Sequence, residues 1–252
     1  MHTELRLIVN EEKGRTKIED AYFTAPVKIM EVSEEKRLKV LLMTASAGML
    51  KDDFYDFHLQ AKAGSKWEFT GQSYTKIFHS NGGQCGQRVQ IRVEDGADFW
   101  YCPCSALPFE KSNFSGDVLV KLDKKASFLY TEVLGAGRVA MGERFAFERY
   151  RNRLLIQVEG VPVFLDYTDY EPARMNLENF MYFDGYTHQG CFYYYGSEEV
   201  QEFILEMELE LEDGMLGVSR ARQGVCIRAL ANGAQNIEAL FQKVKEQIEQ
   251  KG

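Results

Sequence analysis

The sequence predicts a mainly β fold, a large β-rich body of many short strands, helically wound or sandwich-like, with two α-helices near the C-terminus. Apolar and polar residues alternate, as in half-buried strands, as far as about residue 170. Glycine dipeptides, which favour turns, recur between these segments. They are Asn81-Gly82, Asp95-Gly96, Ser115-Gly116 and Glu159-Gly160. The long helices of a parallel α/β sheet are missing, so we expect a succession of short antiparallel strands.

The clearest strands are three runs in which every second residue is aliphatic. They are Val89-Ile91-Val93, Val118-Val120-Leu122 and Leu154-Ile156-Val158. The third run continues across Glu159-Gly160 into Val161, Val163 and Leu165, which predicts a tight hairpin.

The last fifth of the chain changes character. Ser197 can cap a helix that carries Val200, Phe203, Ile204 and Met207, although Leu205, Met207, Leu209 and Leu211 also alternate as in a strand. We favour the helix. A hairpin-like pair at 215–221 and 224–231 then precedes an amphipathic helix, in which Asn232 with Gln235 could form a capping box. The apolar stripe of this helix is Ile237, Leu240, Phe241, Val244 and Ile248. We expect a single domain over 1–252, with a β-rich part (1–196) and a helix-containing part (197–252).

Composition excludes several functions. A net charge of −8 and a pI near 5.2 argue against nucleic-acid binding, which needs Lys and Arg at phosphates. The N-terminus has no signal-peptide pattern and no stretch approaches a membrane span, so we expect a cytoplasmic protein. A phosphate loop and a dinucleotide fingerprint are also absent. The five cysteines are odd in number and scattered, which indicates reduced thiols.

Three local clusters have structural and functional interpretations. Cys102-Pro103-Cys104 places two sulfurs on one strand face, but a soft metal needs more ligands, and small buried side chains are the simpler interpretation. Eight aromatic residues between Phe180 and Tyr195 form either a small core under a loop or a protein interface. Eight acidic and no basic residues lie between Ser197 and Asp213, as on a solvated face or a strip for a basic partner.

The stretch from Gly135 to Glu143 is the most informative. Three glycines surround Arg138, which can pair with Glu132 or Glu143, between two segments that alternate as strands. In one interpretation this is an ordinary hairpin with solvated charges. By parity, however, Glu132 shares a strand face with Phe128 and Tyr130.

The same parity argument applies to two further carboxylates. Glu143 is in register with Phe145 and Phe147, and Asp53 with Tyr55 and Phe57. A carboxylate on an apolar stripe must be paired, hydrogen-bonded, protonated or beside a wet cavity. Together with Asp166, these carboxylates could also serve a β-rich carbohydrate-active hydrolase that uses two of them, and a β-sandwich binding module is a further alternative.

Four motifs in order resemble those of the urease accessory protein family UreD, also called UreH, over about residues 18–245. They are Ala47-Gly48-Met49-Leu50-Lys51-Asp52-Asp53, Gly71-Gln72-Ser73-Tyr74-Thr75-Lys76-Ile77, Pro103 with Leu107-Pro108-Phe109, and Gly137-Arg138 with Gly142-Glu143. Arg228 falls where the family carries an Arg-Val-Leu strand. The first motif departs from the family at Ala47 and Asp52, and the second at Ser73-Tyr74.

The resemblance implies a non-catalytic scaffold of urease maturation. Such a protein binds UreF, which recruits the GTPase UreG, and the assembly docks on apo-urease. The resemblance also allows a dimer of complexes. Nickel would pass transiently through an internal tunnel, with no permanent cofactor and no nucleic-acid or membrane partner. The resemblance assigns a tunnel or polar network to eight residues and leaves the nickel ligands unknown. These residues are Asp53, Gln72, Thr75, Lys76, Glu132, Arg138, Glu143 and Asp166.

Overall fold

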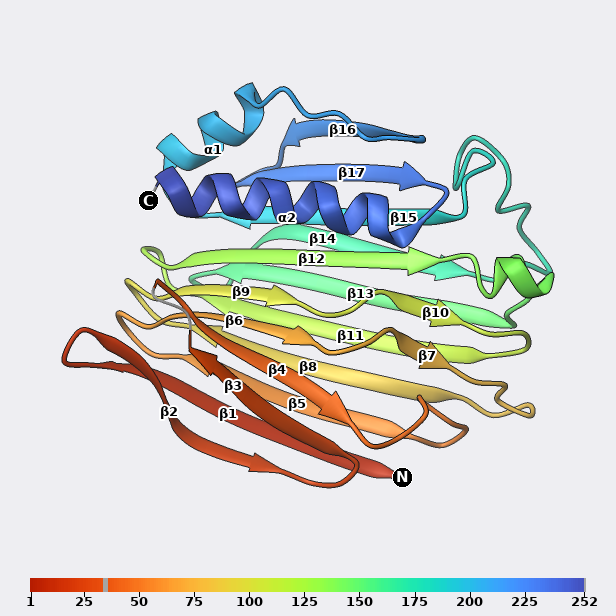
Figure 1. Ribbon diagram of the computed structural model, residues 1–252, viewed down its shortest axis with the longest axis horizontal. Coiled ribbons are helices and arrows are strands. Elements are labelled where there is room, and N and C mark those ends of the chain that lie inside the picture. Colours follow the sequence, from red (N-terminus) through yellow and green to blue (C-terminus); the bar gives the residue numbers. More distant parts are fainter. Residues whose placement is uncertain (34–35, 252) are drawn as a thin grey trace.

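The computed structural model describes residues 1–33 and 36–251 and contains two β-sheets that face each other (Figure 1). Sheet A consists of β1 (His2–Glu12), β2 (Arg15–Phe23), β5 (Phe54–Ala61), β8 (Cys85–Val93), β11 (Asn113–Leu122), β13 (Arg149–Val158) and β14 (Val161–Tyr170). Sheet B consists of β3 (Val27–Ser33), β4 (Leu38–Thr44), β6 (Lys66–Gly71), β9 (Asp98–Cys102), β12 (Ser127–Gly135), β15 (His188–Tyr195), β16 (Gly214–Arg220) and β17 (Val225–Ala231), with the short β7 (Thr75–Ile77) and β10 (Ala106–Pro108) beside it. The helices are η1 (Val139–Met141), α1 (Glu198–Glu206) and α2 (Ala234–Lys251).

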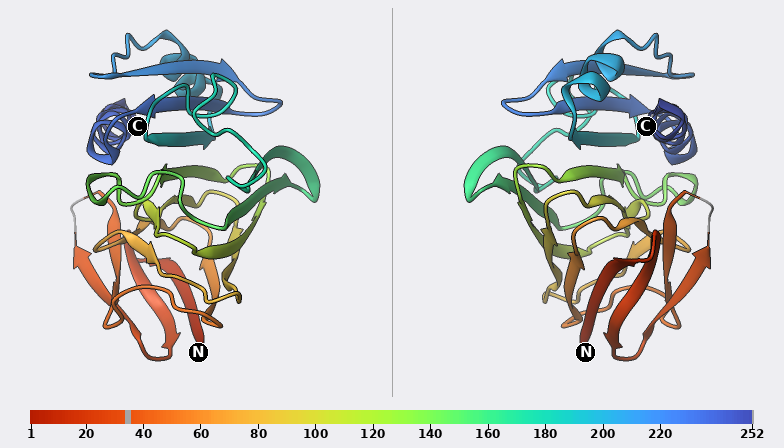
Figure 2. Two further views of the ribbon diagram at one scale, coloured as in Figure 1. Left: turned by 90° about the vertical axis from the view of Figure 1, so that its right-hand side faces the viewer. Right: turned by 90° about the vertical axis from the view of Figure 1, so that its left-hand side faces the viewer.

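The chain winds between the sheets, as the predicted fold class requires. It passes from β5 to β6, from β8 to β9 and from β11 to β12, each time crossing from sheet A to sheet B. Strands of successive turns therefore lie parallel, as β5, β8, β11 and β13 do. The prediction of a mainly antiparallel arrangement was wrong, because a turn such as Asp95-Gly96 leads into the opposite sheet instead of back along its neighbour. The predicted hairpin at Glu159-Gly160 is confirmed between β13 and β14, and this hairpin projects from the body (Figure 2).

Ser115-Gly116 is not a turn, because both residues lie inside β11. A Cβ atom on Gly116 would lie 2.2 Å from Oδ1 of Asn152 in the neighbouring strand β13. The glycine therefore makes room for a buried polar side chain between the sheets.

Two apolar cores hold the layers together. The larger core lies between the sheets and includes Phe57, Trp67 and Phe128, all nearly inaccessible to solvent. The smaller core lies between sheet B and α2. The predicted apolar stripe of α2, from Ile237 to Ile248, is buried there.

The two helices begin close to the predicted places. Ser197 caps α1, since its Oγ accepts a hydrogen bond from the backbone N–H of Val200. The helix ends at Glu206, and the alternating residues that follow are not helical. Before α2, Asn232 donates its side-chain amide to Asp213. Of the described helices, none combines the length and the apolar character that a membrane span needs.

The aromatic stretch 180–195 divides between the two interpretations. The residues of β15, from Phe192 to Tyr195, are buried in the cores, as is Phe183. Phe180 and Met181, in the loop before β15, are more than 70% exposed. The strand therefore belongs to the core, while the loop presents apolar side chains to solvent.

Candidate functional site

Asp53 lies immediately before β5 and is buried, as its parity predicts. One oxygen accepts a hydrogen bond from the N-terminal ammonium group at 2.9 Å, and the other accepts one from the backbone N–H of Leu50 at 2.8 Å. The carboxylate thus ties the chain start to the turn before β5. Both of its oxygens have fixed protein donors.

Thr75 and Lys76 lie in β7, and Gln72 precedes this strand. We call this end of the two sheets the open end, because a cavity lies there. Thr75 and Lys76 line a cavity of about 200 Å³ together with Gly48, Tyr101 and other residues of both sheets, whereas Gln72 is an exposed residue. The first two motifs meet here through backbone contacts. The N–H of Met49 donates to the carbonyl of Lys76 at 2.8 Å, and a Cβ atom on Gly48 would lie 2.4 Å from that same oxygen.

Glu132 lies on β12 and points between the sheets, which confirms the face that its parity predicts. Its carboxylate accepts hydrogen bonds from the hydroxyls of Tyr130 and Tyr150, both at 3.0 Å, and from the amide of Asn152 at 2.8 Å. Burial raises the pKa of Glu132, the nearby Asp166 adds to the effect, and the three hydrogen bonds oppose it. The neighbours Thr131 and Val133 are buried, whereas Glu132 keeps partial exposure. Part of the Glu132 side chain is therefore open to solvent, while its carboxylate is enclosed by three donors.

Asp166 lies across from Glu132 on the inner face of β14. Its Oδ2 accepts a hydrogen bond from Nη1 of Arg228 on β17 at 2.8 Å. Arg228 also lines an open cavity of about 360 Å³ together with Tyr182 and Gln189. Partial loss of hydration would lower the pKa of Arg228, but the hydrogen bond to Asp166 and the negative charge of that carboxylate outweigh it, so the pKa is raised.

Arg138 pairs with Glu143 and not with Glu132. Its Nε donates to Oε2 of Glu143 at 2.8 Å, and the guanidinium stacks on the ring of Phe109 at 4.2 Å. The hydrogen bond from Arg138 lowers the pKa of Glu143. The predicted strand after Gly142 was wrong. Phe145 has φ of 51°, so the alternation breaks there, and the segment from Ala136 crosses from sheet B to β13 in sheet A instead of closing a hairpin.

The predicted residues therefore occupy separate places. Glu132 and Asp166 face each other between the sheets. Thr75 and Lys76 line a cavity at the open end. Asp53 pairs with the N-terminal ammonium group, and Arg138 pairs with Glu143. Parity did not reveal the donors around Glu132. Tyr150 and Asn152 alternate on β13, a pattern that gives their face but not their partner. A tunnel role for the eight residues stays a prediction.

All five cysteines are free, as predicted, and four of them are buried. Burial raises the pKa of Cys102 and of Cys104 to about 11. Within residues 1–33 and 36–251, no three His, Cys, Asp or Glu side chains gather in a group that could hold a metal ion.

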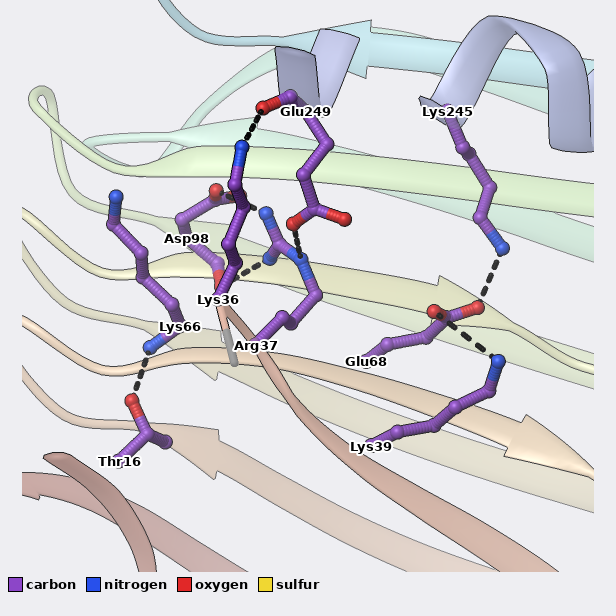
Figure 3. Close-up of polar contacts among 9 residues, drawn as sticks. All are labelled: Thr16, Lys36, Arg37, Lys39, Lys66, Glu68, Asp98, Lys245 and Glu249. Atoms are coloured by element: carbon purple, nitrogen blue, oxygen red, sulfur yellow. Dashed lines mark hydrogen bonds and ion pairs between the residues drawn. The ribbon is translucent and has the colours of Figure 1, made fainter. Parts of the chain in front are cut away.

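Sequence reasoning also missed a polar cluster between sheet B and α2 (Figure 3). Lys245 of α2 forms a buried ion pair with Glu68 of β6. Arg37 contacts Asp98 and Glu249. These partners are far apart in the sequence, and no local pattern connects them.

The molecule belongs to the class of wound, solenoid-like β-proteins, here with a helix on one sheet and a hydrogen-bonded carboxylate between the sheets. The family model described as UreD urease accessory protein matches residues 1–252, and the chain belongs to this family. It is 32% identical over 239 residues to the urease accessory protein UreD of Acetivibrio thermocellus, covering 92% of this chain and 91% of the relative. It is 34% identical over 225 residues to UreH of Helicobacter hepaticus, covering 89% of each chain. The membership confirms the resemblance and supports a role in urease maturation.

Proposed function

We propose that this chain is a non-catalytic scaffold that helps deliver nickel to apo-urease in a complex with UreF and, through UreF, with UreG. Family membership and the relatives named urease accessory protein support this proposal. Every candidate carboxylate is held by donors of the protein itself, as at Glu132 and Asp166. Such fixed groups suit a passage or a framework better than a pair of acid and base catalysts.

The observation that carries the nickel role is the partial exposure of Glu132 between the sheets. The cavity at Thr75 reaches Tyr101, whose ring stacks on Tyr130, a donor to Glu132. On the other side, the ion pair of Asp166 with Arg228 leads to the open cavity beside β17. We infer a route for the divalent cation along this line, because carboxylate, hydroxyl and water oxygens bind such cations weakly enough to release them.

Glu132→Gln tests the route. This substitution keeps the shape of the side chain and removes the charge. We expect urease co-expressed with the variant to contain several-fold less nickel, while the amount of complex recovered stays the same. The measurements are metal content and urease activity per purified complex. Tyr22→Phe serves as the control, since Tyr22 is an exposed residue of β2 that lines neither cavity of the proposed route. Unchanged nickel loading with Glu132→Gln would overturn the route but not the scaffold role.

Exposed apolar side chains support a protein-binding role. Met141 in η1 and Phe180 and Met181 in the loop before β15 are each more than 70% exposed. Arg144 joins the two loops, because it pairs with Glu178 at 2.9 Å. Apolar groups that gather on a surface in this way are typical of interfaces.

We place the UreF contact on these loops. We expect the chain to be poorly soluble alone and to be rescued by co-expressed UreF. Phe180→Ser with Met181→Ser should reduce co-purification with UreF at least tenfold, because two anchors are lost. Equal co-purification of this variant and the parent would refute the placement.

A further inference from the structure

A basic cleft lies at the opposite end of the sheets from the cavity at Thr75. Its volume is about 690 Å³, and five basic but only two acidic side chains line it in a chain whose net charge is −8. The basic residues are Lys36, Arg37, Lys66, Lys124 and Lys125, and the acidic ones are Asp98 and Glu249.

Arg37 connects the elements that border the cleft (Figure 3). Its side chain is buried and lies 3.7 Å from the ring of Trp100. It donates to Oδ2 of Asp98 at 2.6 Å and to Oε1 of Glu249 at 3.0 Å, so both acidic groups of the cleft are already used. Lys36 donates to the backbone carbonyl of Glu249 at 3.1 Å. The start of β4 and the end of α2 are thereby locked together as one wall.

The ammonium groups of Lys66, Lys124 and Lys125 form no ion pair with any group that the structure describes. The nearby carboxylates are engaged elsewhere. Asp95 and Glu159 accept backbone N–H groups of Lys125 and Lys124, and Asp123 pairs with Arg92. At the start of α1, Glu198 pairs with Arg220 and Glu199 with Lys251. The lysines thus add positive charge to a concave site, and the charges of Asp95 and Glu159 offset it only in part, because neither carboxylate forms an ion pair with their ammonium groups.

We propose that this cleft binds a small molecule with two or more phosphate groups, a function separate from the nickel route. Three free ammonium groups match the charge of a diphosphate or triphosphate group, and lysine binds phosphate as a point charge. The volume falls in the usual range of small-molecule sites. Tyr194, Ala126 and Ile248, which are largely buried, form an aromatic and apolar floor on which an organic part of the ligand can lie. The hydroxyl of Ser127 donates to that of Tyr194 at 3.4 Å and offers the ligand a neutral acceptor.

Calorimetric titration of the full chain with pyrophosphate tests the proposal, using the chain alone or in the complex in which it purifies, with the partner alone as a blank. We expect saturable binding at one site per chain. A triple variant, Lys66→Gln with Lys124→Gln and Lys125→Gln, should bind at least about tenfold more weakly, because each charge contributes a few-fold in water. Added salt should weaken binding to the parent more than to the triple variant.

Lys13→Gln with Lys28→Gln and Lys243→Gln is the matched control, since it removes the same number of charges from exposed lysines that lie outside the cleft. We expect this control to bind pyrophosphate as the parent does. A parallel titration with a nucleoside triphosphate distinguishes an organic from an inorganic ligand, and tighter binding than pyrophosphate would favour the organic one. Absence of saturable binding, or an equal loss in the control, would overturn the proposal. Tighter binding of poly-glutamate than of either phosphate would also overturn it, because the site would then fit an acidic peptide. Equal melting temperatures of the variants show that the fold is kept.

Discussion

The two ends of the space between the sheets differ in chemistry, although the same strands of sheet B form both. Two rows of residues in register cross β6, β9, β12 and β15, a third row crosses β12 and β15, and the rows become more polar along the strands. The first row is Trp67, Phe99, Phe128 and Tyr195, the second is Phe69, Tyr101, Tyr130 and Tyr193, and the third contains Glu132 and Cys191.

The aromatic side chains of the first row account for the stability of the fold, whereas the polar side chain of the third row does not. Aromatic side chains stacked between sheets remove a large apolar area from water. The partly buried carboxylate of Glu132 needs three hydrogen-bond donors to offset its loss of hydration, and an apolar residue would fill the same space at lower cost. The aromatic end therefore contributes more to the stability of the fold than the polar end does.

The largest effect should come from the aromatic end. Trp67 is fully buried and stacks on Phe99 with ring centroids 4.0 Å apart. Trp67→Ala should lower the free energy of unfolding by about 3–5 kcal/mol, because it leaves a large cavity. Urea unfolding measures this change. Tyr74→Ala, at a residue 43% exposed, is the control and should change stability by less than about 0.5 kcal/mol. A loss below about 1 kcal/mol for Trp67→Ala would remove the distinction between the two ends.

A smaller effect should come from crowding the polar end. In Gly116→Ala the new methyl group would meet Oδ1 of Asn152, the residue that donates to Glu132. We expect a loss of about 1–3 kcal/mol from overpacking. Asn152→Ala should relieve most of the crowding, so the double variant should lose less than the sum of the single changes. Additive losses would show that Gly116 is needed for another reason.

The pH dependence of stability should separate the ends further. The pKa of Glu132 is raised in the folded protein, mainly by burial. Above the pKa of the unfolded chain, about 4.3, the folded state therefore binds more protons than the unfolded state, and its stability falls as pH rises to the folded pKa. The variant Glu132→Gln has no carboxyl group at this position, so it does not bind this extra proton in the folded state. The stability of the parent relative to the variant should be highest near pH 4 and decrease toward pH 7.

Urea unfolding at several pH values measures this difference. Asp166→Asn is the control, since it removes the second cause of the raised pKa and should make the decrease smaller. A difference between parent and Glu132→Gln that stays constant across pH would mean that Glu132 titrates normally in the folded state.

Much of this architecture could be predicted from the sequence, because alternation reports the face of a strand. It placed Glu132 beside Phe128 and Tyr130 and put Asp53 on the buried face, and both placements are correct. It does not report which strand lies alongside. The parallel order of β5, β8 and β11 was therefore missed, since a glycine turn to a neighbour and one to the opposite sheet look alike.

The polar contacts were harder to predict for the same reason. The acceptor of Tyr150 and the partners of Arg37 come from other strands or from α2, and Arg37 and Glu249 are 212 residues apart. The strand predicted to begin at Glu143 failed for a local reason. The positive φ of Phe145 ends the alternation, although no glycine at that position signals it. Spacing along one segment carries no information on such contacts.

The smallest effect should come from the pair of Arg228 with Asp166, which lies at the solvent side of the polar end. Arg228 pairs with Asp166, but about half of its side chain is exposed, so water and salt screen the pair. Arg228→Gln should cost less than about 1 kcal/mol at physiological salt, and the cost should shrink further at 1 M NaCl. Arg6→Gln, at an arginine 63% exposed beside Glu4, is the matched control for an ordinary surface pair. A loss above about 3 kcal/mol would instead mean that Asp166 is left as an uncompensated buried charge. The polar end would then contribute to the fold as the aromatic end does, and its chemistry would need no functional explanation.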